Sequence, residues 1–120
     1  MTRVISRLLL TAVGASFIAC ARNDIPVKAY ADSEASAKAA ETANAANVPR
    51  AALHLQLARE QLAKAQVYMK ENENDLAARS LRRAKADADL ALALAESDKA
   101  TKEADIAQKK VTDLKQMSPN

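Results

Sequence analysis

The only cysteine in this chain of 120 residues, Cys20, is the residue whose chemistry is easiest to assign. It follows residues 17–19 (Phe-Ile-Ala), which close an apolar run that begins at Leu8. Arg3 and Arg7 stand before this run, so residues 1–19 have the basic start, short apolar stretch and small final residue of a cleaved leader. The run is well short of the ~20 apolar residues that span a bilayer core. We therefore predict a signal peptide at residues 1–19 and not a membrane span.

Small or apolar residues directly before a lone cysteine resemble the cleavage box of bacterial lipoproteins. In those proteins the cysteine thiol takes up a diacylglycerol, and the chain is cut immediately before it. A single cysteine forms no internal disulfide, and acylation would remove a free thiol from an oxidising compartment. We predict that Cys20 is lipidated and that the mature chain is held by membrane lipid. The alternative is a leader cut elsewhere, which would leave a free thiol near the new N-terminus.

The residue after the cysteine bears on which membrane carries the protein. Ala21 resembles the default outer-membrane route of enterobacterial lipoproteins, whereas Asp at this position resembles an inner-membrane retention signal. We expect the periplasmic face of the outer membrane, with inner-membrane retention as the alternative. Without Arg3 and Arg7, 16 of the 18 basic side chains remain against 15 acidic ones, so the net charge falls from +3 to +1. This balance gives no electrostatic reason to expect a nucleic-acid partner.

The other residues with chemical potential are isolated from one another. His54 is the only histidine, and no second His or Cys stands at metal-ligand spacing from it, so we predict a solvated surface histidine and no metal site. The acidic turn at residues 71–75 lacks the loop length and the glycine of a calcium-binding hand. The sequence contains no Gly-rich phosphate loop, nucleophile elbow or paired-carboxylate cleft. We therefore expect a protein that is not an enzyme and that uses no cofactor, metal or small-molecule substrate.

The composition predicts an all-α fold. Alanine is abundant, aromatic residues make up 2% of the chain, and the single glycine lies in the predicted leader. Residues 20–31 contain Pro26 and show no helical period, so we expect a lipid-anchored tether there. A helical domain is predicted to follow at residues 32–117, with Asp32 or Ser33 capping its first helix.

Two breaks divide this helical domain. Val48-Pro49 interrupts the pattern, yet proline suits the first position of a new helix. Asn72 tolerates the left-handed conformation that ends a helix, and Asn74 or Asp75 can cap the next one.

A stripe of apolar residues runs along the chain on both sides of Asn72. Its members step by 4, 3, 4, 3 and 4 residues, which keeps one helix face against a partner. If the turn folds the chain back, each member before it meets a member after it, with residue numbers that add to 146. The members are Ala51, Leu55, Ala58, Leu62, Ala65 and Met69 before the turn, and Ala77, Leu81, Ala84, Ala88, Ala91 and Ala95 after it.

The same arithmetic continues past Pro49. It pairs Ala46 with Ala100, Thr42 with Ala104, Ala39 with Ala107, and Ala35 with Val111. We therefore favour one long antiparallel helical hairpin that is kinked at Pro49, with arms ~60 Å long. The alternative is that residues 33–47 turn back at Pro49 and complete a small three-helix bundle.

Four leucines are the candidate interaction surface of this domain. At ~100° per residue they project from the faces opposite the apolar stripe, at one level of the hairpin. They could form an oligomer or docking surface, pack under a folded-back first helix, or be scattered exposed leucines. We call Leu53, Leu57, Leu90 and Leu94 the leucine surface.

A basic patch adjoins the predicted turn and consists of Arg79, Arg82 and Arg83. It is either an ordinary charged helix face or a contact for an acidic partner. Asp87 stands four residues after Arg83, which predicts an ion pair along one helix face.

Three motifs of the helical domain are typical of one family: Val48-Pro49, Leu55-x-x-Ala58-x-x-x-Leu62-x-x-Ala65, and Ala77-x-x-x-Leu81-x-x-Ala84-x-x-Asp87-Ala88-Asp89-Leu90-Ala91. With them, residues 35–95 resemble the uncharacterised, alanine-rich domain of small proteobacterial envelope lipoproteins, sometimes found upstream of an OmpA-like peptidoglycan-binding domain. The family usually has Gly in its central turn, where this chain has Asn72 and Asn74. No OmpA-like sequence follows, so peptidoglycan binding is not expected, and the resemblance implies no activity.

These observations together predict a lipid-anchored, periplasm-facing structural or protein-interaction module of the bacterial cell envelope. Its partner would be another envelope protein or a second copy of itself. Two alternatives are an oligomeric coiled-coil spacer of the envelope and a holdase or accessory chaperone for envelope transport. The chaperone would grip its clients through the leucine surface.

Overall fold

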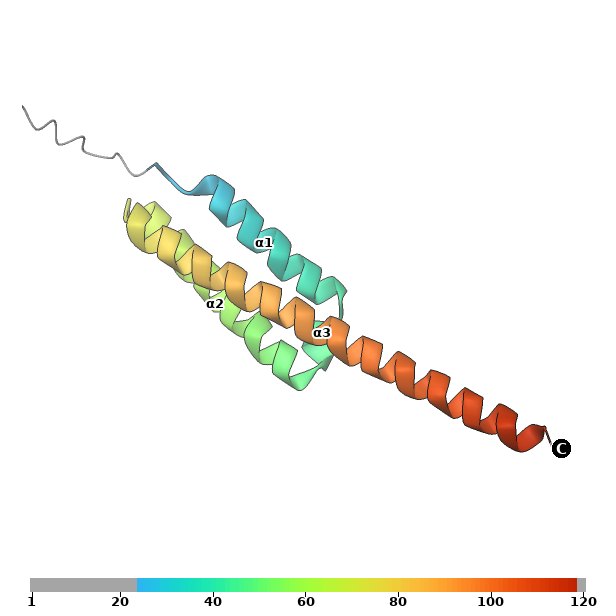
Figure 1. Cartoon of the computed structure of the whole chain (residues 1–120). Coiled ribbons are helices and arrows are strands. Elements are labelled where there is room, and N and C mark those ends of the chain that lie inside the picture. Colours follow the sequence, from blue (N-terminus) through green and yellow to red (C-terminus); the bar gives the residue numbers. More distant parts are fainter. Residues whose placement is uncertain (1–23, 119–120) are drawn as a thin grey trace, which may run out of the picture.

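A computed structural model of the chain describes residues 24–118, and its regular elements are helices (Figure 1). The elements are α1 (Val27–Thr42), the short 3₁₀ helix η1 (Ala45–Asn47), α2 (Pro49–Lys70) and α3 (Asn74–Met117). α2 runs antiparallel to α1 and α3, which are parallel to each other. The predicted all-α class is confirmed. The predicted leader, Cys20 and Ala21 lie outside the described residues.

The kinked hairpin through Pro49 is wrong, and the three-helix bundle is the arrangement that forms. α1 ends at Thr42, and Asn44 has a left-handed backbone with φ of 66°. Val48 is extended, with φ of −109° and ψ of 109°, as expected for a residue before proline. These residues turn the chain back, so that α1 lies beside the α2–α3 hairpin. The pairs from Ala35–Val111 to Ala46–Ala100 do not form.

Packing explains why α1 folds back. Along a continuous hairpin, residues 33–47 would contact a single partner helix, whereas in the bundle α1 packs against both α2 and α3. Contact with two helices removes more apolar surface from water. The residues that α1 buries are Ser33, Ala37 and Ala40, which share one face of the helix.

The helical region begins earlier than residue 32, where it was predicted to start. α1 begins at Val27, with Pro26 at its N-cap position, so residues 27–31 are helical. The Pro26 carbonyl accepts the first helical hydrogen bond, from the Tyr30 amide at 3.0 Å. Asp32 and Ser33 are therefore inside the helix rather than caps. The reason is that the missing N–H of proline is harmless at a helix start, where the amides lack intrahelical partners.

The apolar stripe between α2 and α3 is confirmed by burial. Ten of its twelve predicted members are buried, while Leu62 and Met69 are partly exposed. Among the described residues, Leu55 and Leu81 are the only large apolar side chains that are fully buried. The core is therefore thin, and its alanines allow the helix backbones to approach closely.

A hydroxyl marks the close approach of α1 to α3. Ser33 Oγ lies 2.7 Å from the Ala29 carbonyl oxygen in its own helix and 3.0 Å from the Leu81 carbonyl oxygen of α3. A serine hydroxyl carries one proton, so it donates to these two oxygens in alternation or shares the proton between them. A larger side chain at position 33 would push the two helices apart.

The turn between α2 and α3 has the predicted left-handed asparagine. Asn72 has φ of 61°, and the Glu73 amide donates to the Tyr68 carbonyl at 2.8 Å, which satisfies a carbonyl at the end of α2. The N-cap position of α3 is Glu73, and Asn74 is the first helical residue, so the predicted cap at Asn74 or Asp75 is displaced by one residue or more.

Replacing Asn72 tests this turn. A β-branched Asn72→Val side chain is disfavoured in the left-handed region, so we expect a loss of about 1–2 kcal/mol in the free energy of unfolding. Glycine adopts the left-handed conformation without a steric penalty, so Asn72→Gly should leave the free energy of unfolding unchanged or slightly raised. Thermal melts followed by circular dichroism measure both variants. Equal melting temperatures for the two would contradict a left-handed residue at this position.

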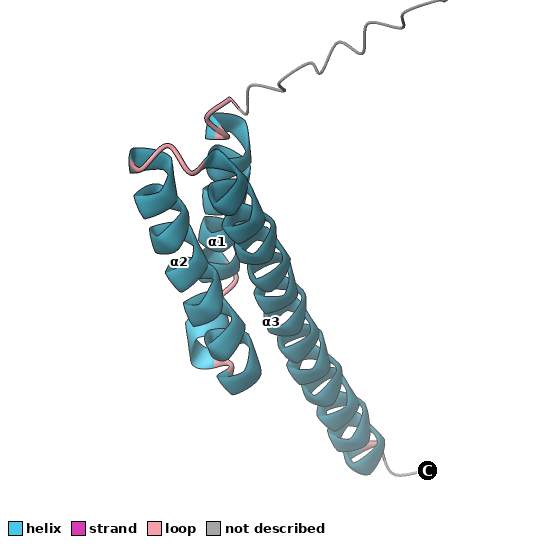
Figure 2. Ribbon diagram, turned by 90° about the vertical axis from the view of Figure 1, so that its left-hand side faces the viewer, coloured by secondary structure: helices cyan, strands magenta, loops and turns pink. Residues whose placement is uncertain are grey.

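α3 continues well beyond the bundle (Figure 2). It has 44 residues, which corresponds to ~66 Å at 1.5 Å per residue. Ala95 is its last buried residue, and every residue from 99 to 118 is exposed. We call residues 99–117 the α3 extension.

Candidate interaction surface

A His–Asp contact joins α2 and α3 at the level of the four leucines. His54 Nδ1 lies 2.9 Å from Asp87 Oδ1, and about a quarter of each side chain is exposed. The prediction of a solvated histidine is therefore wrong, because the ring is half-buried against a neighbouring helix. The predicted ion pair between Arg83 and Asp87 does not form among the described residues. Asp87 contacts His54 instead.

The four leucines differ in how much they expose. Leu53 and Leu90 are 56% and 43% exposed, so α1 does not cover them. Leu57 and Leu94 are half-buried, and Leu94 packs against the core. His54 lies one turn from Leu57 in α2 and Asp87 one turn from Leu90 in α3, so the His–Asp contact brings the leucines of both helices to one level. Packing under the folded-back first helix does not occur for Leu53 and Leu90.

The basic patch continues this surface toward the α2–α3 turn. Arg79, Arg82 and Arg83 are all exposed on α3. Leu90 lies seven residues, or about two turns, after Arg83 on the same side of the helix. Leu90 and Arg83 thus share one side of α3, with an apolar group and a cationic group two turns apart.

α1 attaches on a different side of the hairpin, through polar contacts at its edges. Arg59 of α2 bonds Glu41 of α1, with Nη2 at 2.6 Å and Nε at 3.1 Å from the same carboxylate oxygen. On α3, Lys85 Nζ lies 3.2 Å from Ser36 Oγ. Such exposed contacts each contribute little to stability, so their main effect is to fix the register of α1.

The same lysine perturbs a carboxylate. Lys85 Nζ donates to Asp89 Oδ2 at 2.8 Å, and this hydrogen bond lowers the pKa of the Asp89 carboxyl below its ordinary value. The Ser36 hydroxyl lowers this pKa further, against the opposing effect of partial burial. A lowered pKa stabilises the fold above the ordinary carboxyl pKa, and that contribution is lost as the pH falls through the lowered value.

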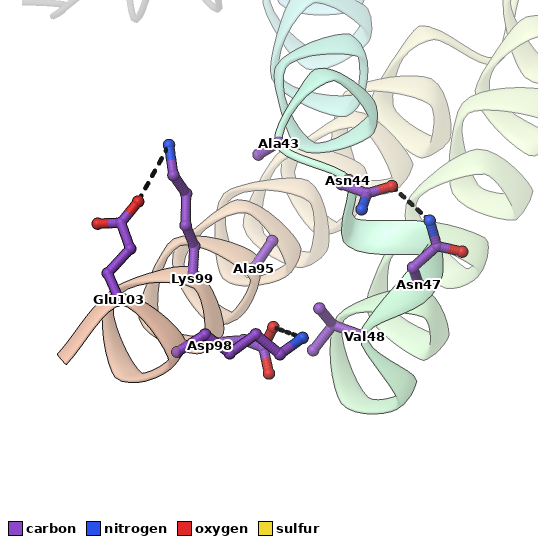
Figure 3. Close-up of a pocket in the computed structure, with 9 residues that line it drawn as sticks. Ala43, Asn44, Asn47, Val48, Ala95, Asp98, Lys99 and Glu103 are labelled. Carbon is purple, nitrogen blue, oxygen red and sulfur yellow. Dashed lines mark hydrogen bonds and ion pairs between the residues drawn. The ribbon is translucent and has the colours of Figure 1, made fainter. Parts of the chain in front are cut away.

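A shallow groove lies where α3 leaves the bundle (Figure 3). Its volume is about 230 Å³, and charged side chains surround its apolar floor. These charges are paired along α3, with Lys102–Asp98 at 2.7 Å and Lys99–Glu103 at 3.9 Å. The groove is lined by Ala43, Asn44, Asn47, Val48, Ala95, Asp98, Lys99, Lys102 and Glu103.

The predicted site residues thus fall into two groups. Leu53, Leu90 and the three arginines are exposed on α2 and α3, and Leu57 and Leu94 are half-buried. Cys20 lies outside the described residues. Between residues 24 and 118, no three His, Cys, Asp or Glu side chains gather where they could hold a metal ion. No helix in that range combines the length and the apolar character needed to cross a membrane.

Comparison with known proteins identifies the family alone. Residues 28–107 match the family model described as a domain of unknown function (DUF4398). No curated protein and no solved structure matches the chain. The matched segment begins one residue after the start of α1 and ends within the α3 extension, so it contains all of the bundle except Val27. Since it covers two thirds of the sequence, the chain belongs to the DUF4398 family.

Proposed function

We propose that this chain is a lipid-anchored, periplasm-facing interaction module of the bacterial cell envelope, without enzymatic activity. The observation that carries the proposal is the leader pattern that ends at Cys20, with a basic start, a short apolar run and small or apolar residues before a lone thiol. Acylation of that thiol would hold the chain at the outer membrane, where Ala21 favours its delivery.

The short tether supports a defined orientation in this proposal. α1 begins at Val27, so only residues 21–26 separate it from Cys20. Six residues reach about 20 Å when extended. The α2–α3 turn lies at the same end of the bundle as the start of α1, because α1 and α3 run parallel. In the anchored protein this end would lie near the membrane, and the α3 extension would lead away from it.

The exposed leucines support an interaction role. Leu53 and Leu90 are exposed at one level of α2 and α3, and Arg79, Arg82 and Arg83 are exposed nearer the turn on α3. An apolar area with neighbouring cations suits a partner that offers apolar side chains and carboxylates. An envelope protein with such an acidic rim is the partner that we propose.

Replacing the cysteine tests the anchor. We expect the Cys20→Ser precursor to escape acylation and cleavage, so that it is larger than the mature chain and its N-terminal peptide carries no acyl group by mass spectrometry. Ser16→Ala in the leader is the control, and it should mature and fractionate with membranes like the parent protein. A Cys20→Ser chain that still matures and pellets with outer membranes would rule out the anchor.

The interaction role is checked in the same cells. A photo-crosslinking residue at position 53 or 90 should capture one common protein, whereas the same residue at the exposed Lys38 of α1 should not. Adding Leu90→Ser to the position-53 variant should reduce the capture severalfold. Equal capture from all three positions would contradict a partner at the leucine surface.

A further inference from the structure

The α3 extension is a helix without packing partners in the described part of the chain. All of its residues are exposed, including Val111 at 44% and Leu114 at 66%. Most of the stability of a helix in a protein comes from tertiary packing of one face, and the extension has no buried face among the described residues. The pairs Lys99–Glu103 and Lys102–Asp98 support its first turns, but exposed ion pairs of this kind contribute little.

One face of the extension has the spacing of a helix–helix contact. Its apolar members step by 4, 3, 4 and 3 residues, as do those of the buried stripe between α2 and α3. At this spacing they lie on one side of the helix, over ~21 Å. The members are Ala100, Ala104, Ala107, Val111 and Leu114.

We propose that the α3 extension pairs with the same segment of a second copy of this chain, in antiparallel orientation, with Glu103 of each copy opposite Lys110 of the other. The occupant of the apolar face is thus a second copy. This inference does not rest on the proposed anchor, since it concerns only residues at the opposite end of the molecule.

The charges beside the apolar face select the orientation. Glu103 and Lys110 each directly precede a member of the face, so they flank it on the same edge. In an antiparallel pair this edge of one copy lies along the same edge of the other copy. Glu103 of each copy then lies beside Lys110 of its partner, so the contact occurs twice by symmetry. In a parallel pair Lys110 would instead meet the partner's Lys115, again twice. The antiparallel pair has two attractive contacts, and the parallel pair has two repulsive ones.

The sizes of the apolar residues agree with the same register. It places Ala100 opposite the partner's Val111 and Ala104 opposite the partner's Ala107. Each larger side chain therefore faces a small one, and two alanines meet at the centre, as in the close packing of α2 against α3. Small residues at the centre let the backbones approach, and the larger residues fill the space toward the ends.

The bundle leaves room for this partner. α1 ends at Thr42, and its last buried residue, Ala40, comes before the point where α3 becomes fully exposed. The partner's Met117 would reach the level of Ala95, on the side of α3 that carries the exposed Ala93 and Ser97. The second copy thus meets an exposed side of α3 that neither α1 nor α2 covers.

Cysteine crosslinking distinguishes the two orientations. The full chain is prepared in mild detergent with Cys20→Ser, so that only introduced thiols react, and then carries either Ala100→Cys or Val111→Cys. We expect an equal mixture of the two variants to form a disulfide-linked dimer under oxidation, at least tenfold faster than either variant alone. In the antiparallel pair, positions 100 of the two copies are ~16 Å apart along the axis, too far for a disulfide. Dimers from Ala100→Cys alone at the rate of the mixture would overturn the proposal, because only a parallel pair aligns equal positions.

Charge reversal provides an independent measurement on the uncrosslinked chain. Sedimentation equilibrium should show a dimer, and Glu103→Lys or Lys110→Glu should each raise its dissociation constant about tenfold. The double variant Glu103→Lys with Lys110→Glu should restore it. Lys109→Glu, with the same charge change on the opposite side of the helix, is the matched control and should leave it unchanged. A monomer at every concentration, or no recovery in the double variant, would overturn the proposal.

Discussion

Replacing Leu81 with alanine is expected to lower the free energy of unfolding by about 2–5 kcal/mol, which is a large part of the stability of a small domain. Leu81 is completely buried, and among residues 24–118 only Leu55 is a large apolar side chain buried to a similar degree. The neighbouring core residues are mostly alanines, whose short side chains cannot move into the space that is left. The cavity would therefore persist, and thermal or urea unfolding followed by circular dichroism should show the loss.

Leu53→Ala is the matched control for this experiment. It removes the same atoms from a leucine that is 56% exposed on α2, so we expect a change below about 1 kcal/mol. Similar losses in the two variants would mean that Leu53 is covered in solution, either by another part of the chain or by a second copy. Repeating the measurement over a range of protein concentrations separates those two cases.

The second large effect is expected from a charge on the buried face of α1. Ala40 is fully buried between α1 and the hairpin, so Ala40→Glu would place a carboxylate in a site without a cationic partner. A loss of about 3 kcal/mol or more is expected. Hydrogen exchange should show that α1 loses its amide protection first, because α2 and α3 retain the stripe of alanines that joins them.

Ala39→Glu is the control, and it also separates the two arrangements that the sequence allowed. Ala39 is exposed in the bundle, so a glutamate there should change the free energy of unfolding by less than about 0.5 kcal/mol. In the kinked hairpin, Ala39 would instead face Ala107 and would be the sensitive position. A harmful Ala39→Glu together with a harmless Ala40→Glu would therefore contradict the bundle.

The sequence predicts the α2–α3 hairpin well because several signals agree there. Asn72 permits the left-handed turn, Pro49 begins α2, and leucines at Leu55 and Leu81 distinguish one helix face from the others. In α1 this distinction is missing, because alanine occupies several faces. The spacing of Ala35, Ala39 and Thr42 suits a contact as well as that of Ser33, Ala37 and Ala40.

What decides the path of α1 is tertiary. Asn44 takes a left-handed backbone, and the Ser33 hydroxyl finds the Leu81 carbonyl 48 residues away. Neither property follows from local spacing. The His54–Asp87 contact was missed for a related reason, because each residue by itself fits a solvated helix flank. Only the position of α3 against α2 shows that the two side chains meet.

The parallel course of α1 and α3 has a mechanical consequence. The start of α1 and the end of α3 lie at opposite ends of the rod (Figure 1). A pulling force between these ends would slide α1 along α3 in shear, so that all contacts between the two helices would resist it at once. Opening the helices from one end would break those contacts one after another, at a lower force. The bundle is therefore built to transmit tension along its length and to yield more easily to a sideways pull on α1.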